Sequence, residues 1–326
     1  MKNGALVIGA GSWGSAIASA LIRSGCETSV LARKRKSVDA LADGKCLQLP
    51  NCTSNFRINA SRDPNLIKPA RLIFVAVPVQ KNSEVFDLIS EKQRGSKAGV
   101  IILCAKGIST QRNGNAILLP DLLSEMLPNH PSAILSGPSF ADEVFSGLQA
   151  ALVVASDDPE ITAEVQKTFE GSNLRVYRNN DPIGVSVAGA MKNVIAIAAG
   201  CAIGAGYGDN AKAAILTRGL AEMRRFAVFM GAKHETIYGL AGVGDLALTC
   251  AGPHSRNMAF GIAIGRGETP QRVLAEGSKT VAKLAKLAKT KGIELPITNA
   301  VNELVNNGQN LHHVVTELLS RPAGLE

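Results

Sequence analysis

The segment Gly9–Gly14 constrains the fold more than any other part of this 326-residue chain. It reads Gly-Ala-Gly-Ser-Trp-Gly, follows the short apolar run 5–8 directly, and opens a helical pattern that Gly25 ends. In such a strand–turn–helix unit the first glycine allows a tight turn. The second lets the backbone approach a pyrophosphate, and the third lets the helix pack on the strand. The segment predicts a dinucleotide site; the alternative is a glycine-rich turn that binds nothing.

The two halves of the chain have different periodicities. Apolar strand patterns alternate with helical stretches in the first half, and almost no strand pattern follows Asp181. The strand patterns cover residues 5–8, 28–32, 72–77, 100–104, 133–135 and 151–154, and helical patterns begin at 183, 211, 257, 279 and 297. Glycine-rich turns are expected at 206–208, 242–244 and 252–253. We therefore predict an α/β fold: a Rossmann-type, doubly wound, mainly parallel sheet over residues 1–181, followed by an all-α domain over residues 182–326.

The composition restricts the possible partners. The formal net charge is +8, which suits an acidic partner such as nucleic acid, anionic lipid or a phosphorylated small molecule. Basic residues are spread along the chain and aromatic residues make up only 4%, which argues against a nucleic-acid surface. The six cysteines contain no C-x-x-C pair, so we expect buried reduced thiols and a cytoplasmic protein.

Two segments imitate membrane-directed sequences. Lys2 precedes an apolar run that resembles a signal peptide, but the glycines of the 9–14 segment interrupt that run. Residues 183–205 are long enough to span a bilayer, yet Lys192 and Asn193 stand at the middle, where a charge costs about 3 kcal/mol. We interpret this stretch as a buried helix and expect no membrane insertion.

A run of cations follows the second predicted strand. A fold that prefers NAD usually has Asp or Glu at this position to hold the ribose 2′-hydroxyl. Here the position holds Arg33, and Lys34, Arg35 and Lys36 follow it. Because such cations hydrogen-bond a 2′-phosphate, we expect NADP(H) to be accepted and preferred. The alternative is a solvated basic helix start.

Two lysines have the placement of reactive groups. Lys106 follows the strand that ends at Cys104, at the carboxyl edge of the sheet where α/β folds bind ligands. Lys192 lies in the apolar helix of the second domain, and burial lowers a lysine pKa toward neutrality, which suits proton transfer to a ketone. For either lysine the alternative is a snorkelling or ion-paired surface residue.

A polar cluster follows a glycine–proline turn in the second half. Ser255, Arg256 and Asn257 combine a helix N-cap, a guanidinium and an amide, a combination that suits a phosphate. Asp245 lies upstream, where a carboxylate near the active lysine would orient it. The alternative is a capped helix start and a loop aspartate. Lysines at helical spacing further on are interpreted as a solvated face without function: Lys279, Lys283, Lys286 and Lys289.

Taken together, these segments resemble the bacterial NAD(P)-dependent glycerol-3-phosphate dehydrogenase family over nearly the whole chain. The resemblance rests on residues 9–14, 104–107, 136–141 with Glu143, 189–193, 239–246, 255–257, and 276–277 with Thr280. Any one of these matches could arise by chance, but all of them occur in order and at family-like distances.

The resemblance implies an enzyme that interconverts dihydroxyacetone phosphate and sn-glycerol 3-phosphate by hydride transfer, with Lys192 as the general acid/base. It implies NADPH/NADP or NADH/NAD as cofactor, no metal, a homodimer, and supply of glycerol 3-phosphate for phospholipid synthesis. Motif and resemblance together predict cofactor contacts at Gly9, Gly11, Ser12, Trp13, Gly14, Arg33, Lys34, Lys106, Ala141, Arg256, Leu274 and Glu276. Predicted substrate contacts are Lys106, Gly137, Ser139, Lys192, Asp245, Ser255, Arg256 and Asn257.

Two other classes of protein share parts of this pattern. A β-hydroxyacid or 6-phosphogluconate-type dehydrogenase also has a Rossmann domain, a helical domain and a lysine in a helix. The 255–257 cluster and the 137–140 loop argue against that class. A nucleotide-sensing module would keep the glycine segment but would not need Lys192 and Asp245.

Overall fold

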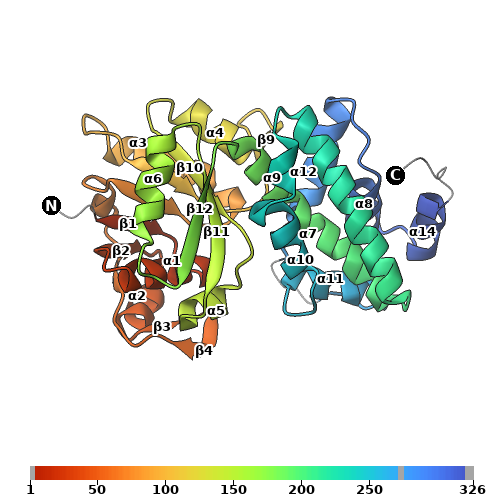
Figure 1. Cartoon of the computed structure of the whole chain (residues 1–326), viewed down its shortest axis with the longest axis horizontal. Coiled ribbons are helices and arrows are strands. Elements are labelled where there is room, and N and C mark those ends of the chain that lie inside the picture. The colour runs from red at the N-terminus through yellow and green to blue at the C-terminus, as the bar shows by residue number, and fades with distance from the viewer. Residues whose placement is uncertain (1–3, 271–274, 320–326) are drawn as a thin grey trace. The chain divides into compact units, whose positions relative to one another are not determined.

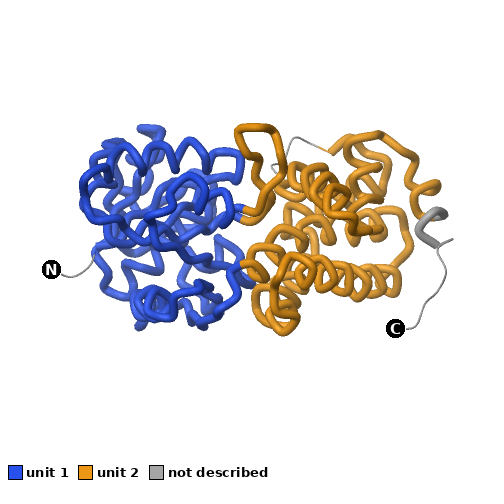
Figure 2. Tube along the Cα trace, turned by 90° about the horizontal axis from the view of Figure 1, so that it is seen from above, with its two compact units in different colours: residues 1–105, 119–182 blue, residues 106–118, 183–326 orange. Residues whose placement is uncertain are grey.

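The computed structural model describes residues 4–270 and 275–319. The chain forms two compact units, shown in different colours in Figure 2. The first unit comprises Met1–Ala105 and Leu119–Pro182, and the second comprises Lys106–Leu118 and Ile183–Glu326. Residues 106–118 fall within the range expected for the first domain, but they pack as part of the second unit.

An eight-stranded sheet forms the centre of the first unit, with the order β12-β11-β10-β7-β6-β1-β2-β5. All neighbours are parallel except β10 and β11, so the sheet is mainly parallel, as predicted. The strands are β1 (Ala5–Ile8), β2 (Thr28–Leu31), β5 (Asn59–Ser61), β6 (Leu72–Val75), β7 (Val100–Leu103), β10 (Ser132–Ser136), β11 (Ala150–Ala155) and β12 (Leu174–Asn179). A separate two-stranded ladder joins β3 (Lys45–Cys46) and β4 (Leu49–Thr53).

Six α-helices belong to the described part of this unit (Figure 1). They are α1 (Ser12–Arg23), α2 (Arg35–Ala42), α3 (Asn82–Lys92), α4 (Leu119–Met126), α5 (Ala141–Ser146) and α6 (Pro159–Thr168), with short 3₁₀ turns at Pro64–Ile67 (η1) and Val79–Lys81 (η2). Every residue of β1, β6 and β7 is buried. Strands covered on both faces must be apolar throughout, which explains why their sequences are unbroken apolar runs.

The second unit is helical apart from one hairpin, in which β8 (Ile108–Thr110) pairs antiparallel with β9 (Ala116–Leu118). Its described helices are α7 (Pro182–Gly204), α8 (Gly208–Phe229), α9 (His234–Ile237), α10 (Asp245–Thr249), α11 (Arg256–Gly265), α12 (Glu276–Thr290), α13 (Pro296–Asn306) and α14 (Leu311–Leu319). The turn expected at residues 242–244 is wrong, because Leu240–Gly244 (η3) forms a π-helical segment that leads into α10.

Helix α7 is the central element of the second unit. It is long and apolar enough to cross a membrane, but 83% of its most apolar window is buried inside the protein. It is therefore a buried core helix, as predicted. The N-terminal apolar run is likewise part of the sheet and of α1. All six cysteines are free thiols; Cys26 and Cys52 are half-buried rather than buried.

Glycines allow α11 to lie unusually close to α7. A Cβ atom on Gly261 would collide with the carbonyl oxygen of Ile197, and one on Gly200 would collide with that of Met258. Only glycine permits such an approach of two helix backbones. This contact fixes the first turn of α11 beside the middle of α7, where Lys192 and Asn193 lie.

Candidate active site

The turn between β1 and α1 has the geometry that the glycine segment predicts. Gly9 has φ +117°, and a Cβ there would lie 2.6 Å from the carbonyl oxygen of Ala76. A Cβ on Gly14 would collide with the carbonyl oxygen of Gly9, so helix and strand pack through this residue. Gly11 differs, because no heavy atom lies within 4 Å of a Cβ placed there. The second glycine thus faces open space, where a pyrophosphate would approach.

The start of α1 offers hydrogen-bond donors to that space. Gly11 is the N-cap and supplies no side-chain cap, so the first N–H groups of the helix, at Ser12 and Trp13, have no acceptor within the helix. Trp13 Nε1 is also buried without a hydrogen-bond partner in the described structure. Unpaired donors and a positive helix end fit the phosphates of a dinucleotide.

The cations after β2 are available to a ligand. Arg33 and Lys34 are exposed, and neither has an ion-pair partner in the described chain. Arg35, by contrast, is paired with Asp39 at 2.9 Å.

The first unit also holds Gly137, with φ +128°, whose carbonyl oxygen accepts a hydrogen bond from Ser139 Oγ at 3.2 Å. Ala141 is the first residue of α5, the helix that packs against α1.

Lys192, Asp245 and Lys106 meet in the second unit. One carboxylate oxygen of Asp245 accepts a hydrogen bond from Lys192 Nζ at 2.6 Å, and the other accepts one from Lys106 Nζ at 2.6 Å. Lys192 and Asp245 are buried, and the Lys106 side chain is only 14% exposed. Three separate segments of the chain, the start of the hairpin, the middle of α7 and the start of α10, thus form one buried triad. Two ammonium groups share one carboxylate, which leaves the triad with a net positive charge.

The surroundings of Lys192 set its acidity. Its pKa is lowered to about 8, first by burial and then by the positive charge of Lys106, while Asp245 and Glu276 act in the opposite direction. Thr249 Oγ1 accepts a further hydrogen bond from Lys192 Nζ at 2.8 Å and donates one to the Asp245 carbonyl at 2.6 Å. Thr249 is not among the site residues predicted from the sequence. The signal was its spacing of four residues from Asp245, which places both on one face of a helix.

Asn257 links three helices beside this triad. Its Nδ2 donates to Asn193 Oδ1 on α7 at 2.9 Å, and its Oδ1 accepts from the Gly277 amide on α12 at 2.9 Å. A Cβ on Gly277 would lie only 2.6 Å from the Asn193 carbonyl oxygen, so α12 begins in contact with α7. Glu276, half-buried at the start of α12, is held close enough to act on the Lys192 charge.

The other two members of the 255–257 cluster have different environments. Ser255 is buried, and its Oγ accepts from the Met258 amide at 3.4 Å, so it is the predicted N-cap. Arg256 is exposed and has no partner in the described chain, which leaves its guanidinium free for an anion. Leu274, also predicted as a cofactor contact, lies outside the described residues.

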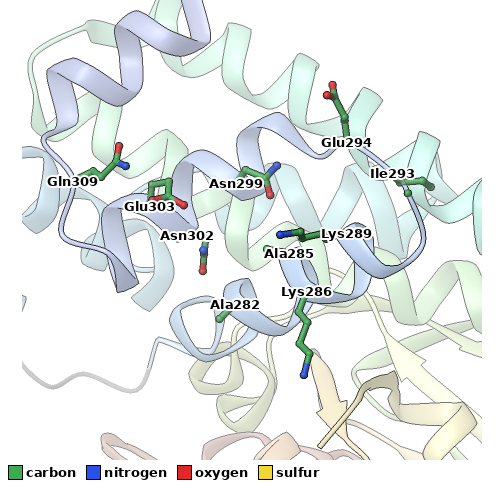
Figure 3. Close-up of a pocket in the computed structure, with 11 residues that line it drawn as sticks. Ala282, Ala285, Lys286, Lys289, Ile293, Glu294, Asn299, Asn302, Glu303 and Gln309 are labelled. Carbon is green, nitrogen blue, oxygen red and sulfur yellow. The ribbon is translucent and has the colours of Figure 1, made fainter.

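A separate groove of about 820 Å³ lies between α12 and α13 (Figure 3). Its walls include Lys286 and Lys289, Asn299, Asn302 and Glu303, and none of the predicted site residues lines it. We assign it no function. The lysine face of α12 is not uniformly solvated as expected, since Lys283 is half-buried and burial lowers its pKa.

Within the described ranges, no group of three His, Cys, Asp or Glu side chains is arranged to hold a metal ion. The first unit carries a dinucleotide turn and a free basic edge, and the second unit carries a buried Lys–Asp–Lys triad. A Rossmann sheet and a helical unit that carries a poised lysine define the class of two-part nicotinamide-dependent dehydrogenases.

Comparison with known proteins narrows this class. Residues 5–162 match the family model "NAD-dependent glycerol-3-phosphate dehydrogenase N-terminus", and residues 181–316 match the corresponding C-terminus model. The chain therefore belongs to the NAD-dependent glycerol-3-phosphate dehydrogenase family. The predicted family, fold class, enzyme class and nicotinamide cofactor are thus confirmed.

Individual relatives are similar to this chain along almost its whole length. Glycerol-3-phosphate dehydrogenase [NAD(P)+] of Mesorhizobium japonicum is 40% identical, over 98% of this chain and 93% of the relative. The protein of the same name from Brucella ovis is 41% identical over 98% of each. The crystal structure of glycerol-3-phosphate dehydrogenase from Coxiella burnetii superposes with a TM-score of 0.89 at 34% identity, and covers 98% of this chain and 99% of that one.

Proposed function

We propose that this chain reduces dihydroxyacetone phosphate to sn-glycerol 3-phosphate, and catalyses the reverse oxidation, with Lys192 as the group that exchanges the proton. The nicotinamide cofactor supplies or accepts the hydride. The proposal rests above all on Lys192, a buried ammonium whose pKa of about 8 keeps it mostly protonated at neutral pH yet able to release its proton.

The neighbouring residues have complementary roles. Asp245 holds the ammonium groups of Lys192 and Lys106 by its two carboxylate oxygens, which orients the proton donor. The net positive triad attracts an anionic substrate, and the free guanidinium of Arg256 at the start of α11 suits the phosphate group. Gly137, Ser139, Ser255 and Asn257 complete the proposed substrate contacts.

Most of the proposed cofactor contacts belong to the first unit. Gly9, Gly11, Ser12, Trp13 and Gly14 receive the pyrophosphate at the start of α1. Arg33 and Lys34 bind the 2′-phosphate and favour NADP(H), because both are exposed and unpaired. Ala141 of α5, and Lys106, Arg256 and Glu276 of the second unit, are further proposed contacts. In this proposal residues 1–181 form the dinucleotide-binding domain, and residues 182–326 form the helical domain that carries the catalytic lysine.

The direct test is oxidation of NADPH by the purified protein, followed by absorbance, with dihydroxyacetone phosphate and with unphosphorylated dihydroxyacetone. We expect turnover only with the phosphate ester. Lys192→Ala is expected to abolish turnover while NADPH binding, measured by calorimetry, persists. Turnover that survives in Lys192→Ala would refute the assigned role, and absence of turnover in the wild type would refute the proposed reaction.

We further propose a homodimer that works in the cytoplasm, without membrane insertion, and supplies glycerol 3-phosphate to phospholipid synthesis. Support comes from the family and from the burial of α7, the apolar helix. Light scattering at micromolar concentration should give twice the chain mass of 34.1 kDa, and the protein should stay in the supernatant when lipid vesicles are pelleted. A monomer, or co-sedimentation with vesicles, would contradict these assignments.

A further inference from the structure

The ends of three neighbouring strands lie in one row at the carboxyl edge of the first unit's sheet. The pairing register places Ile8 of β1 opposite Leu31 of β2, and Leu31 opposite Ser61 of β5. Backbone hydrogen bonds close the row, because Gly9 donates to the Leu31 carbonyl at 3.0 Å and Ala32 donates to the Ser61 carbonyl at 2.8 Å. The glycine turn, the basic run and the residue after Ser61 therefore leave the sheet side by side.

The residue after Ser61 is Arg62, an exposed arginine. The register that pairs Leu31 with Ser61 places Arg62 beside Ala32, the residue before Arg33. Neighbouring strands lie about 4.8 Å apart, so Arg62 and Arg33 leave adjacent strand ends. The order along the edge is then the glycine turn of β1, Arg33 after β2, and Arg62 after β5. In Rossmann sheets the ribose that carries the 2′ group lies at the end of the second strand, which here is the strand that precedes Arg33 and neighbours β5.

No side chain in the described structure neutralises Arg62. The adjacent carboxylate, Asp63, is turned to its own backbone, because its Oδ1 accepts from the Asn65 amide at 2.9 Å and caps the 3₁₀ turn η1. Ser61 Oγ accepts from the Asp63 amide at 3.1 Å and fixes the turn that follows the arginine. Arg62 is thus a free guanidinium on a defined turn.

We propose that Arg62 is a second specificity-determining residue for the cofactor, which binds the 2′-phosphate of NADP(H) together with Arg33. Two guanidinium groups from neighbouring strands hold a phosphate dianion from two sides, with charge-assisted hydrogen bonds that a ribose hydroxyl cannot match. The inference rests on the proposed function and extends it, since Arg62 belongs to neither the glycine segment nor the basic run after β2.

The test compares Arg62→Gln with Arg57→Gln, a matched exposed arginine just before the opposite end of β5. In Arg62→Gln we expect the KM for NADPH to rise about tenfold relative to the KM for NADH, the loss typical of one charge-assisted contact. Binding of adenosine 2′,5′-bisphosphate, measured by calorimetry, should weaken by a similar factor, while Arg57→Gln leaves both quantities at the wild-type value. Thermal unfolding followed by Trp13 fluorescence establishes that both variants are folded.

The outcomes separate this inference from the proposed function. Equal effects of Arg62→Gln on NADPH and NADH, or wild-type bisphosphate affinity in that variant, would overturn the role of Arg62. Absence of turnover in the wild type with either cofactor would overturn the proposed reaction. In that case bisphosphate binding, which needs no catalysis, still decides the role of Arg62.

Discussion

The pKa of Lys192 is set by burial and by charged neighbours that act in opposite directions. Burial accounts for most of the fall in its pKa, the Asp245 carboxylate raises the pKa, and the Lys106 ammonium lowers it. Because reduction of a ketone needs Lys192 protonated, kcat for reduction should fall as pH rises through the pKa of Lys192, about 8. This fall at high pH is the alkaline limb of the kcat profile. Removal of each charged neighbour should move the limb in a direction that tests the role of that neighbour.

Asp245→Asn removes the charge that stabilises the ammonium of Lys192, so the alkaline limb of kcat should move to lower pH by about one unit. Lys106→Met removes a like charge, so in that variant the limb should move to higher pH by a similar amount. Both variants will be slower than the wild type. A shared direction of movement, or none, in the pH profiles from pH 6 to 10 would contradict the arrangement of the triad.

At the scale of elements, the sequence predicts the buried strands and the long helices well and the edge elements poorly. Strands β1, β6 and β7 are unbroken apolar runs because both faces are covered. Strand β12 alternates buried and exposed residues up to Tyr177, and β5 has only three residues, so neither gives a clear apolar signal. The π-helical segment η3 is stabilised by packing of Gly242 against the Ile237 backbone, a contact that no periodicity reveals.

The candidate site is likewise only partly predictable from the sequence. Motifs identify Lys106, Lys192 and Asp245 as reactive types, but their meeting depends on the packing of three segments far apart in the sequence. Asn257 is predicted as a substrate contact, and in this structure its amide also binds Asn193 and Gly277, each through one hydrogen bond. That bridge requires the close approach of α7, α11 and α12. Such an approach depends on tertiary contacts of glycines, which the local sequence does not specify.

The turn between β1 and α1 permits a prediction that separates folding from binding. Gly11→Ala places a methyl group in open space, so its cost should be limited to the poorer N-cap, about 1 kcal/mol or less. The same methyl group blocks the pyrophosphate. Saturating NADPH at one hundred times its Kd stabilises the wild type by about 2.7 kcal/mol, and we expect Gly11→Ala to lose this effect.

Gly14→Ala is the matched control. There the added Cβ collides with the Gly9 carbonyl oxygen, so the unliganded protein itself should lose about 1–3 kcal/mol from overpacking. Urea unfolding with and without NADPH measures both quantities. Retention of the NADPH effect in Gly11→Ala would show that the phosphates do not approach this glycine.

The whole molecule consists of two units with separate hydrophobic cores, so its unfolding need not be a single transition. The chain contains one tryptophan, Trp13, and it belongs to the first unit. Its fluorescence therefore reports the unfolding of the Rossmann unit, while far-ultraviolet circular dichroism is dominated by the helices of the second. A change in stability that appears in the fluorescence signal but not in the circular dichroism signal can therefore be assigned to the first unit.

This division allows a pH-dependent stability to be assigned to His130. Gln93 donates to the Ile67 carbonyl, accepts from the Gly99 amide, and lies with its Oε1 3.1 Å from His130 Nε2. Nε2 therefore carries the proton of the neutral ring, and Nδ1 is buried without a partner in the described structure. A second proton on Nδ1 would be desolvated, which is why burial lowers the pKa of His130 below its ordinary 6.5.

When the pKa of a histidine is lower in the folded state, the unfolded chain takes up the proton first as the pH falls below 6.5. The stability that the histidine contributes is therefore complete above pH 6.5 and is lost as the pH falls. The free energy of unfolding by tryptophan fluorescence should thus fall between pH 6.5 and 5.5, with up to about 1.4 kcal/mol per pH unit due to His130. His130→Gln should remove that part of the slope, whereas His234→Gln, at an exposed histidine, should keep it. Equal slopes in the two variants would contradict this role of His130.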